Sequence, residues 1–294
     1  MRSLLFVPAD APRKLEKALG SGADALILDL EDSVAASGKE TARRHAAAFL
    51  AGLGDRAGAP LLYLRVNGLA TGLADDDLAA VMPGQPDGIV LPKAVLGQDV
   101  DALAARLAVH EAEIGIADGA TRILPIVTET ARAVLALFGA SRGSARLSGL
   151  AWGAEDLSAD LGAETNRDGS GAWTGPYRLA RDLTLLAAAA VEVDAIDTVQ
   201  AAYRDLDCLD RACREARRDG FSAKMAIHPA QVPVINAAFS PTQAELAEAR
   251  AVVAAFAAAP GAGAIGLAGE MLDRPHLRRA ERLLARRERA AGRP

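Results

Sequence analysis

The sequence predicts a (β/α)8 TIM barrel with a C-terminal helical extension, and three observations carry this prediction. Eight short runs rich in leucine or β-branched residues alternate with longer stretches of helical character, the pattern of βα units around a parallel sheet. Polar residues stand where nearly every one of these runs ends. A length of 294 residues suits a single barrel of this kind with some chain left over.

The predicted strands are short apolar runs. In order they cover residues 3–8, 25–31, 61–67, 88–93, 122–129, 147–153, 195–200 and 224–229. The predicted helices cover 38–52, 99–115, 178–191, 205–219, 242–258 and 276–290, the last two after the eighth strand. The Gly/Ala-rich segment 257–273 reads as a flexible connection. We therefore expect a catalytic barrel over 1–256, and over 257–294 an extension or lid that reaches a neighbouring subunit.

Composition narrows the function classes. The content of 51% hydrophobic and 24% charged residues is that of a globular protein, and the net charge of −5 disfavours nucleic-acid binding, although the chain ends in a basic run. No apolar stretch is long enough to span a bilayer, and the N-terminal one is too short for a signal peptide. We expect a cytoplasmic enzyme. Cys208 and Cys213 lie in one helical pattern and predict ordinary packing.

The stretch "ALILDLEDSV" (25–34) is apolar through Leu28 and then presents three carboxylates, which are costly to bury without a partner. Other polar residues also follow predicted strands, and barrel enzymes build their sites at the C-terminal ends of the strands, so we expect one shared rim. Its members are Asp29, Glu31, Arg65, Asn67, Lys93, Glu129, Glu155, Asp156 and His228.

The residue types on this rim indicate the chemistry. Several carboxylates without a nucleophile beside a base do not resemble an acyl-enzyme hydrolase. Hard oxygen ligands suit Mg²⁺, with Mn²⁺ as a substitute, and an arginine suits an anionic substrate or a developing oxyanion. The residues alone thus predict a Mg²⁺-dependent barrel enzyme acting on a carboxylate-bearing or carbonyl substrate.

Eight motifs in order along nearly the whole chain resemble the citrate lyase β-subunit-like family of the HpcH/HpaI aldolase superfamily, which includes malyl-CoA and citramalyl-CoA lyases. They are "RSLLFVPAD", "ILDLEDSV", "LRVNG", "GIVLPKA", "VTETA", "WGAEDLSADLG", "GFSAKMAIHPAQ" and "GEMLDRPH". Thr128 and Leu272 depart from the commoner residues of these motifs without removing a functional group.

The resemblance implies roles for the acidic residues and the arginine. Glu129 and Asp156 would bind Mg²⁺, and Asp29 and Glu31 would hold metal-bound water. Arg65 would contact the 2-oxo acid and the thioester enolate.

The resemblance also implies the binding of the remaining parts of the substrate. The backbone of Gly153, Ala154 and Glu155 would receive the 2-oxo acid carboxylate. Lys39 and Arg43 would meet the phosphates of coenzyme A, although their spacing equally suits a solvated helix face.

Asp273 would act as base or acid from a neighbouring subunit, in a homo-oligomer that we expect to be a trimer. The implied reaction is retro-Claisen cleavage of a citramalyl-, citryl- or malyl-CoA thioester to acetyl-CoA and a 2-oxo acid. Alternatives stay open. They are a malate-synthase or thioesterase activity, a β subunit acting on an acyl-carrier-protein thioester, a Schiff-base aldolase using Lys93, and a non-catalytic barrel that serves as a subunit of a larger lyase. For Glu129 and Asp156 the structural alternative is that they form buried ion pairs with arginines.

Overall fold

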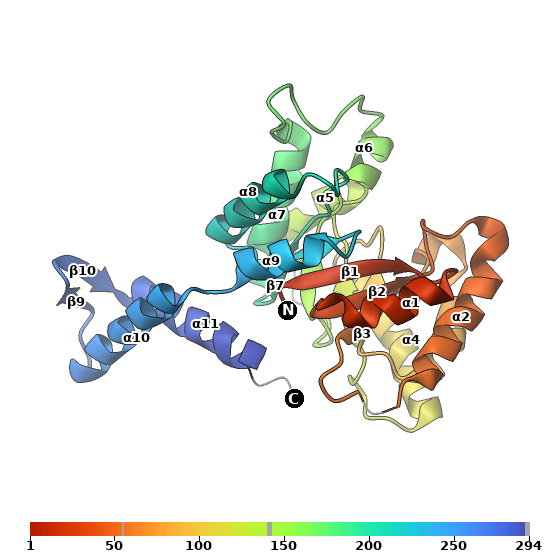
Figure 1. Ribbon diagram of the computed structural model, residues 1–294, viewed down its shortest axis with the longest axis horizontal. Coiled ribbons are helices and arrows are strands. Elements are labelled where there is room, and N and C mark those ends of the chain that lie inside the picture. Colours follow the sequence, from red (N-terminus) through yellow and green to blue (C-terminus); the bar gives the residue numbers. More distant parts are fainter. Residues whose placement is uncertain (55, 140–142, 292–294) are drawn as a thin grey trace. The chain divides into compact units, whose positions relative to one another are not determined.

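The computed structural model describes residues 1–54, 56–139 and 143–291, and the chain divides into two compact units, Met1–Asn236 and Ala237–Pro294 (Figure 1). The sequence placed this division at residue 256. The helix predicted over 242–258 instead belongs to the second unit.

Eight parallel strands form the sheet of the first unit, in the order β5-β4-β3-β2-β1-β8-β7-β6. Their bounds are β1 Ser3–Pro8, β2 Ala25–Asp29, β3 Leu61–Arg65, β4 Gly88–Leu91, β5 Arg122–Pro125, β6 Gly149–Ala151, β7 Asp194–Asp197 and β8 Ala223–Ala226. Each lies inside a predicted strand or within one residue of it. The predicted TIM barrel is confirmed.

The two ends of this strand order, β5 and β6, meet and close the ring. Parallel bridges pair Ile123 with Leu147 and Ile126 with Ala151, and the Val127 N–H donates to the Ala151 carbonyl at 2.9 Å. The polar residues that follow β5 and β6 are thereby held next to each other.

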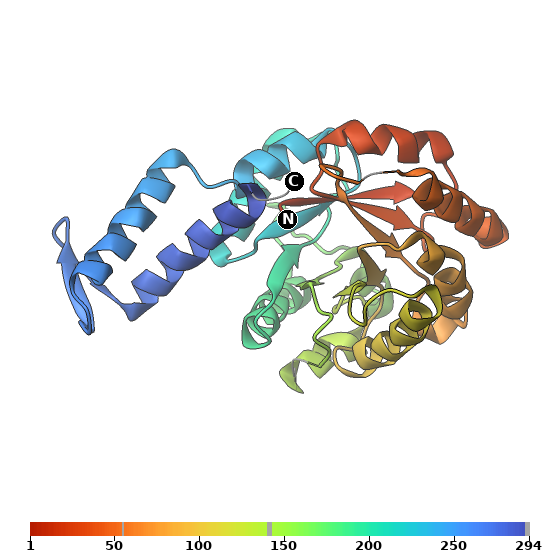
Figure 2. The same ribbon diagram turned by 90° about the horizontal axis from the view of Figure 1, so that it is seen from below.

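Helices surround the strands of the first unit on the outside, as Figure 2 shows. They are α1 Pro12–Ala18, α2 Lys39–Gly52, α3 Ala74–Val81, α4 Gln98–Ile114, α5 Ala131–Ala136, α6 Glu155–Leu161, α7 Gly175–Ala190, α8 Leu206–Asp219 and α9 Gln231–Phe239, whose last residues enter the second unit. The short helices α1, α3, α5, α6 and α9 were not predicted, because runs of six to nine residues show little helical periodicity.

Buried side chains from all eight strands fill the barrel interior. Tyr63 is the largest of them, and Gly88 on the neighbouring strand makes room for its ring, because a Cβ at Gly88 would lie 2.3 Å from a Tyr63 ring carbon. This packed interior leaves the strand ends as the place for a site.

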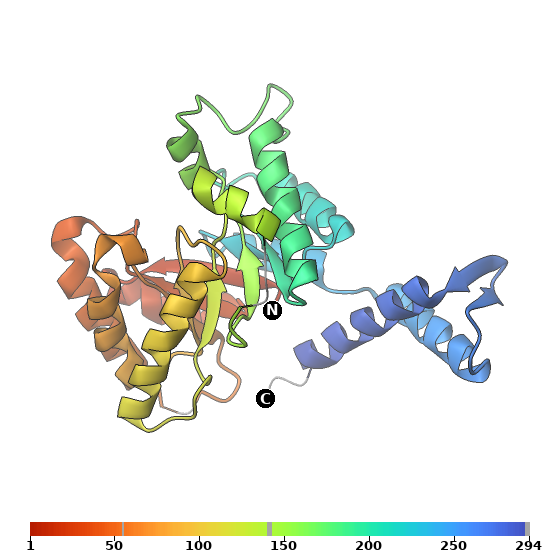
Figure 3. The same ribbon diagram turned by 180° about the vertical axis from the view of Figure 1, so that it is seen from behind.

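The second unit consists of two helices, α10 Gln243–Ala258 and α11 Arg274–Ala291, with an antiparallel hairpin of β9 Ala264–Leu267 and β10 Glu270–Asp273 between them (Figure 3). A capping box between Thr242 and Glu245 begins α10. The prediction of a flexible connection over 257–273 is wrong for its second half. Gly269, at φ +85, follows Ala268 in the two-residue turn that such a hairpin needs. Phe256, Leu272 and Ala280 pack together in a small core.

No helix within the described ranges is both long and apolar enough to cross a membrane.

Candidate active site

The strand register brings Asp29 and Arg65 together. β2 and β3 pair in parallel with Asp29 beside Arg65, and the guanidinium donates to both carboxylate oxygens, at 2.7 and 2.6 Å. Burial alone would raise the pKa of Asp29, but the hydrogen bonds and charge of Arg65 outweigh it, so the pKa is lowered. Arg65 also lies over the Phe6 ring, 4.8 Å from its centroid. Its orientation is therefore fixed before any substrate arrives.

Glu31 continues the network from the loop after β2. One of its oxygens forms an ion pair of 2.9 Å with Arg65, and the other accepts a hydrogen bond from the ammonium of Lys93. Burial raises the pKa of Glu31, and the two cations only partly offset that effect. Glu31 thus connects Arg65 to Lys93.

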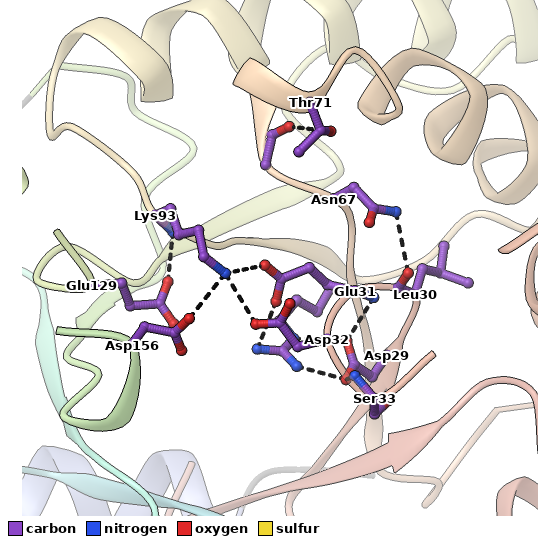
Figure 4. Close-up of polar contacts among 12 residues, drawn as sticks. Asp29, Leu30, Glu31, Asp32, Ser33, Asn67, Thr71, Lys93, Glu129 and Asp156 are labelled. Atoms are coloured by element: carbon purple, nitrogen blue, oxygen red, sulfur yellow. Dashed lines mark hydrogen bonds and ion pairs between the residues drawn. The ribbon is translucent and has the colours of Figure 1, made fainter. Parts of the chain in front are cut away.

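Lys93 stands at the centre of the acidic cluster, just beyond the end of β4 (Figure 4). Besides Glu31, its ammonium contacts Asp32 at 3.0 Å and Asp156 at 3.1 Å. Burial would lower the pKa of Lys93, but these carboxylates raise it above its ordinary value. A Schiff-base lysine reacts as the neutral amine, so these contacts speak against the aldolase alternative.

Glu129 follows β5 and is buried and tightly packed. It is 3% exposed, and one of its oxygens accepts a hydrogen bond of 2.5 Å from the Lys93 backbone N–H. A Cβ at Gly153 would lie 2.7 Å from the Cγ of Glu129, so only glycine leaves room for this side chain. Burial, and next the negative charge of Asp156, raise the pKa of Glu129 to about 8.

Asp156 lies beside Glu129, in the first turn of α6 directly after β6 (Figure 4). The whole cluster holds five carboxylates, Asp29, Glu31, Asp32, Glu129 and Asp156, against two cations, Arg65 and Lys93. The carboxylates thus outnumber the cations, and Glu129 and Asp156 lie side by side, an arrangement that suits a bound cation.

The proposed carboxylate-binding backbone also lies here. The Gly153 N–H already donates to the Thr128 hydroxyl at 3.1 Å. Ala154 is the N-cap of α6 and Glu155 its first residue, a position where backbone N–H groups lack partners within the helix. The Glu155 side chain is exposed and accepts a hydrogen bond of 3.1 Å from Asn166. The expected role of this backbone stays a prediction.

Lys39 and Arg43 have partners within the protein. The Lys39 ammonium donates to the Leu30 and Glu31 carbonyls, both at 2.8 Å, and Arg43 binds the fully buried Asp77 at 2.7 Å. These contacts fix the loop after β2 and join α2 to α3. They give neither side chain the free cationic group that a phosphate site needs, so the role in coenzyme A binding stays a prediction without structural support.

Asp273 ends β10 in the second unit, where its carboxylate lies 2.6 Å from the Nδ1 of His276. The hydrogen bond to His276 lowers the pKa of Asp273. A carboxylate of this kind is a hydrogen-bonded base, and its expected action on a neighbouring barrel stays a prediction.

Sequence reasoning missed the central place of Lys93 and the contribution of Asp32. Lys93 was noted only as a polar strand end and as a rival Schiff-base residue, because nothing in "LPKA" shows that the ammonium reaches two other strand ends. The hydroxyl of Thr128, which ties β5 to β6, was likewise noted only as a departure. The available signal was a polar residue next to Glu129, the glutamate that is predicted to bind the metal.

The chain folds as an eight-stranded barrel with carboxylates gathered at the carboxyl ends of its strands, an arrangement typical of a TIM-barrel enzyme. A protein-family model described as the carbon–carbon bond lyase of the TIM-barrel fold matches residues 177–290. More broadly, the model described as HpcH/HpaI aldolase/citrate lyase matches residues 2–229. The chain belongs to the HpcH/HpaI aldolase/citrate lyase family, and it is a carbon–carbon lyase.

Characterised relatives match over nearly the full length. The chain is 36% identical to a (3S)-malyl-CoA thioesterase of Cereibacter sphaeroides, over 98% of this chain and 94% of the relative. It is 31% identical to the citrate lyase subunit beta of Leuconostoc mesenteroides, over 96% and 92%. The crystal structure of the protein CitE from Mycobacterium tuberculosis, in complex with magnesium, acetoacetate and coenzyme A, superimposes with a TM-score of 0.75 at 33% identity, covering 97% of each chain.

Proposed function

We propose that this protein is a Mg²⁺-dependent lyase that cleaves a 3-hydroxy-3-carboxy acyl-CoA thioester, of the citramalyl, citryl or malyl type, into acetyl-CoA and a 2-oxo acid. The observation that carries the proposal is the pairing of Glu129 and Asp156 next to the Arg65 network at the barrel mouth. The similar structures support it, since the protein CitE is described in complex with magnesium and pyruvate, and a citrate lyase beta subunit in complex with oxaloacetate and magnesium, both from Mycobacterium tuberculosis.

The residues fit Mg²⁺. Mg²⁺ typically takes one or two carboxylates and leaves its other positions to water and substrate. The structure brings two carboxylates, Glu129 and Asp156, side by side at the barrel mouth (Figure 4). Burial, and next the charge of Asp156, raise the pKa of Glu129 to about 8, and a divalent cation would favour the ionised form of both groups.

When bound, Mg²⁺ supplies Lewis-acid polarisation of the substrate's carboxylate and hydroxyl oxygens. The protein's own residues stabilise the charge that develops and transfer the proton. Arg65, fixed by Asp29 and Glu31, stabilises the enolate oxygen that forms as the carbon–carbon bond breaks. Asp273 of a neighbouring subunit takes the hydroxyl proton, which starts the cleavage, and protonation of the enolate carbon then gives acetyl-CoA.

Two further candidates have specific support. The malyl-CoA thioesterase at 36% identity favours hydrolysis of the thioester after, or instead of, carbon–carbon cleavage. The citrate lyase subunit beta at 31% identity supports the alternative that this chain is a β subunit, for which we expect an acyl-carrier-protein thioester in place of the coenzyme A thioester. Product analysis separates hydrolysis from carbon–carbon cleavage, and a comparison of coenzyme A and acyl-carrier-protein thioesters as substrates separates the two carriers.

The test is an activity screen with malyl-, citramalyl- and citryl-CoA in the presence of Mg²⁺, with the 2-oxo acid and free thiol measured separately. EDTA should abolish cleavage, and Mg²⁺ or Mn²⁺ should restore it. Glu129→Gln and Asp156→Asn should each weaken Mg²⁺ binding in calorimetry, while Glu215→Gln, an exposed control on α8, should not. Full activity in EDTA would refute the proposal.

A further inference from the structure

Lys93 holds a backbone conformation that lysine seldom adopts. Its φ is +53°, in the left-handed region, which costs residues other than glycine free energy because Cβ crowds the following carbonyl. Strained residues of this kind persist where surrounding contacts hold them, and they gather at functional sites.

We propose that Lys93 is a positioning residue whose side-chain ion pairs hold its backbone in the left-handed region, so that its N–H points at the carboxylate of Glu129. The coupling between the Lys93 ion pairs and the hydrogen bond to Glu129 does not depend on the proposed function. Only its expected effect on Mg²⁺ binding rests on that function.

The backbone half of the coupling is the hydrogen bond from the Lys93 N–H to Glu129, at 2.5 Å (Figure 4). Glu129 is buried, and Gly153 packs against its Cγ, so its carboxylate has little freedom to follow a donor that moves away. The direction of one N–H therefore sets the direction of a proposed metal ligand.

The side-chain half is the set of ion pairs from the ammonium. Glu31 and Asp32 follow β2, and Asp156 follows β6, which lies four strands away around the ring. The end of β4 lies between the ends of β2 and β6, and from there a long cationic side chain is needed to contact the carboxylates at both strand ends. A glycine would adopt the same φ without strain but would supply no ammonium, which explains a lysine at this position.

A matched pair of variants separates the two halves. Lys93→Ala and Lys93→Gly both delete the ammonium, but only glycine keeps the left-handed backbone without strain. We expect the amide of residue 93, followed by hydrogen exchange without metal, to keep its protection in Lys93→Gly. In Lys93→Ala the protection factor should fall at least tenfold below that of Lys93→Gly, the factor that corresponds to ~1.4 kcal/mol.

The same pair should differ in Mg²⁺ affinity, measured by calorimetry without thioester. Because both variants lose the same charge, the roughly tenfold weaker binding expected for Lys93→Ala relative to Lys93→Gly reports backbone position alone. Gln85, at φ +50° before β4, provides the control, since Gln85→Ala and Gln85→Gly should bind Mg²⁺ equally.

Equal amide protection in the two Lys93 variants would overturn the inference, as would equal Mg²⁺ affinity when the native protein binds the ion. If the native protein binds no Mg²⁺, the proposed function fails, and the exchange measurement alone still decides the role of Lys93.

Discussion

Arg65 contacts two carboxylates with a planar group, and this geometry decides what its substitution does. Two of its nitrogens bind Asp29 and a third lies 2.9 Å from Glu31. Lysine keeps the charge but has no fork, so Arg65→Lys should lower kcat about a hundredfold, as loss of an oxyanion donor does. Steady-state kinetics with the active thioester measures this, with the exposed Arg44→Lys as control. A raised KM with unchanged kcat would mean that Arg65 only binds substrate.

At the level of single residues, the acidic network could be largely predicted. Asp29, Glu31, Arg65, Glu129 and Asp156 follow strands in the sequence, and parallel strands bring their ends to one rim. The sequence did not show which carboxylate each cation contacts, since that depends on how far side chains reach across the barrel. For the same reason the internal partners of Lys39 and Arg43 were not foreseen.

Among the elements, α4 and the segment before β6 are joined by an ion pair at the end of the barrel opposite the site. Arg146 donates to both oxygens of Glu111, each at 2.7 Å, and Glu111 also accepts from the Thr121 and Gly119 N–H groups. Burial raises the pKa of Glu111, but these bonds outweigh it and lower the pKa to about 2.

This shift predicts how stability depends on pH. The unfolded pKa is near its ordinary 4.5, so the contribution of Glu111, up to ~3 kcal/mol, is complete above pH 4.5 and is lost as the pH falls toward 2. Glu111→Gln should be less stable at pH 7, with a difference from the native protein that shrinks under acid. Urea denaturation at several pH values measures it. A difference independent of pH would show that Glu111 is not ionised in the folded state.

Elements with strong periodicity could be predicted, and short ones could not. The helices α2, α4, α7 and α8 lie within about three residues of the predicted ranges because each buries one face of several turns. The β9–β10 hairpin was missed because "GAIGLAGEMLD" is rich in glycine, which typically indicates a loop. Here Gly269 serves the turn itself.

For the whole molecule, the proposed reaction requires groups from both units. We predict that Asp273 works on the barrel of another subunit. Asp273→Asn and Arg65→Ala proteins should each be inactive alone, and their mixture should regain part of the activity because some sites then hold both native residues. A kinetic assay after subunit exchange measures this.

Two controls make that experiment decisive. Light scattering establishes the oligomer, expected to be a trimer, and labelled subunits confirm that exchange has occurred. A fully exchanged mixture without activity would contradict the intersubunit model. His276→Asn should also be tested in the same mixtures, since it keeps a polar partner for Asp273 but removes the imidazole.

The positions of the site residues along the chain carry a consequence for how the protein is made. The cationic part of the site lies within residues 29–93, on strands that pair with their neighbours in order, whereas Glu129 and Asp156 follow β5 and β6, where the ring closes. A chain that leaves the ribosome N-terminus first therefore has Arg65 and Lys93 synthesised before Glu129 and Asp156, the predicted metal ligands. The ammonium of Lys93 can therefore contact all three of its carboxylates only after Asp156, the last of them, has been synthesised.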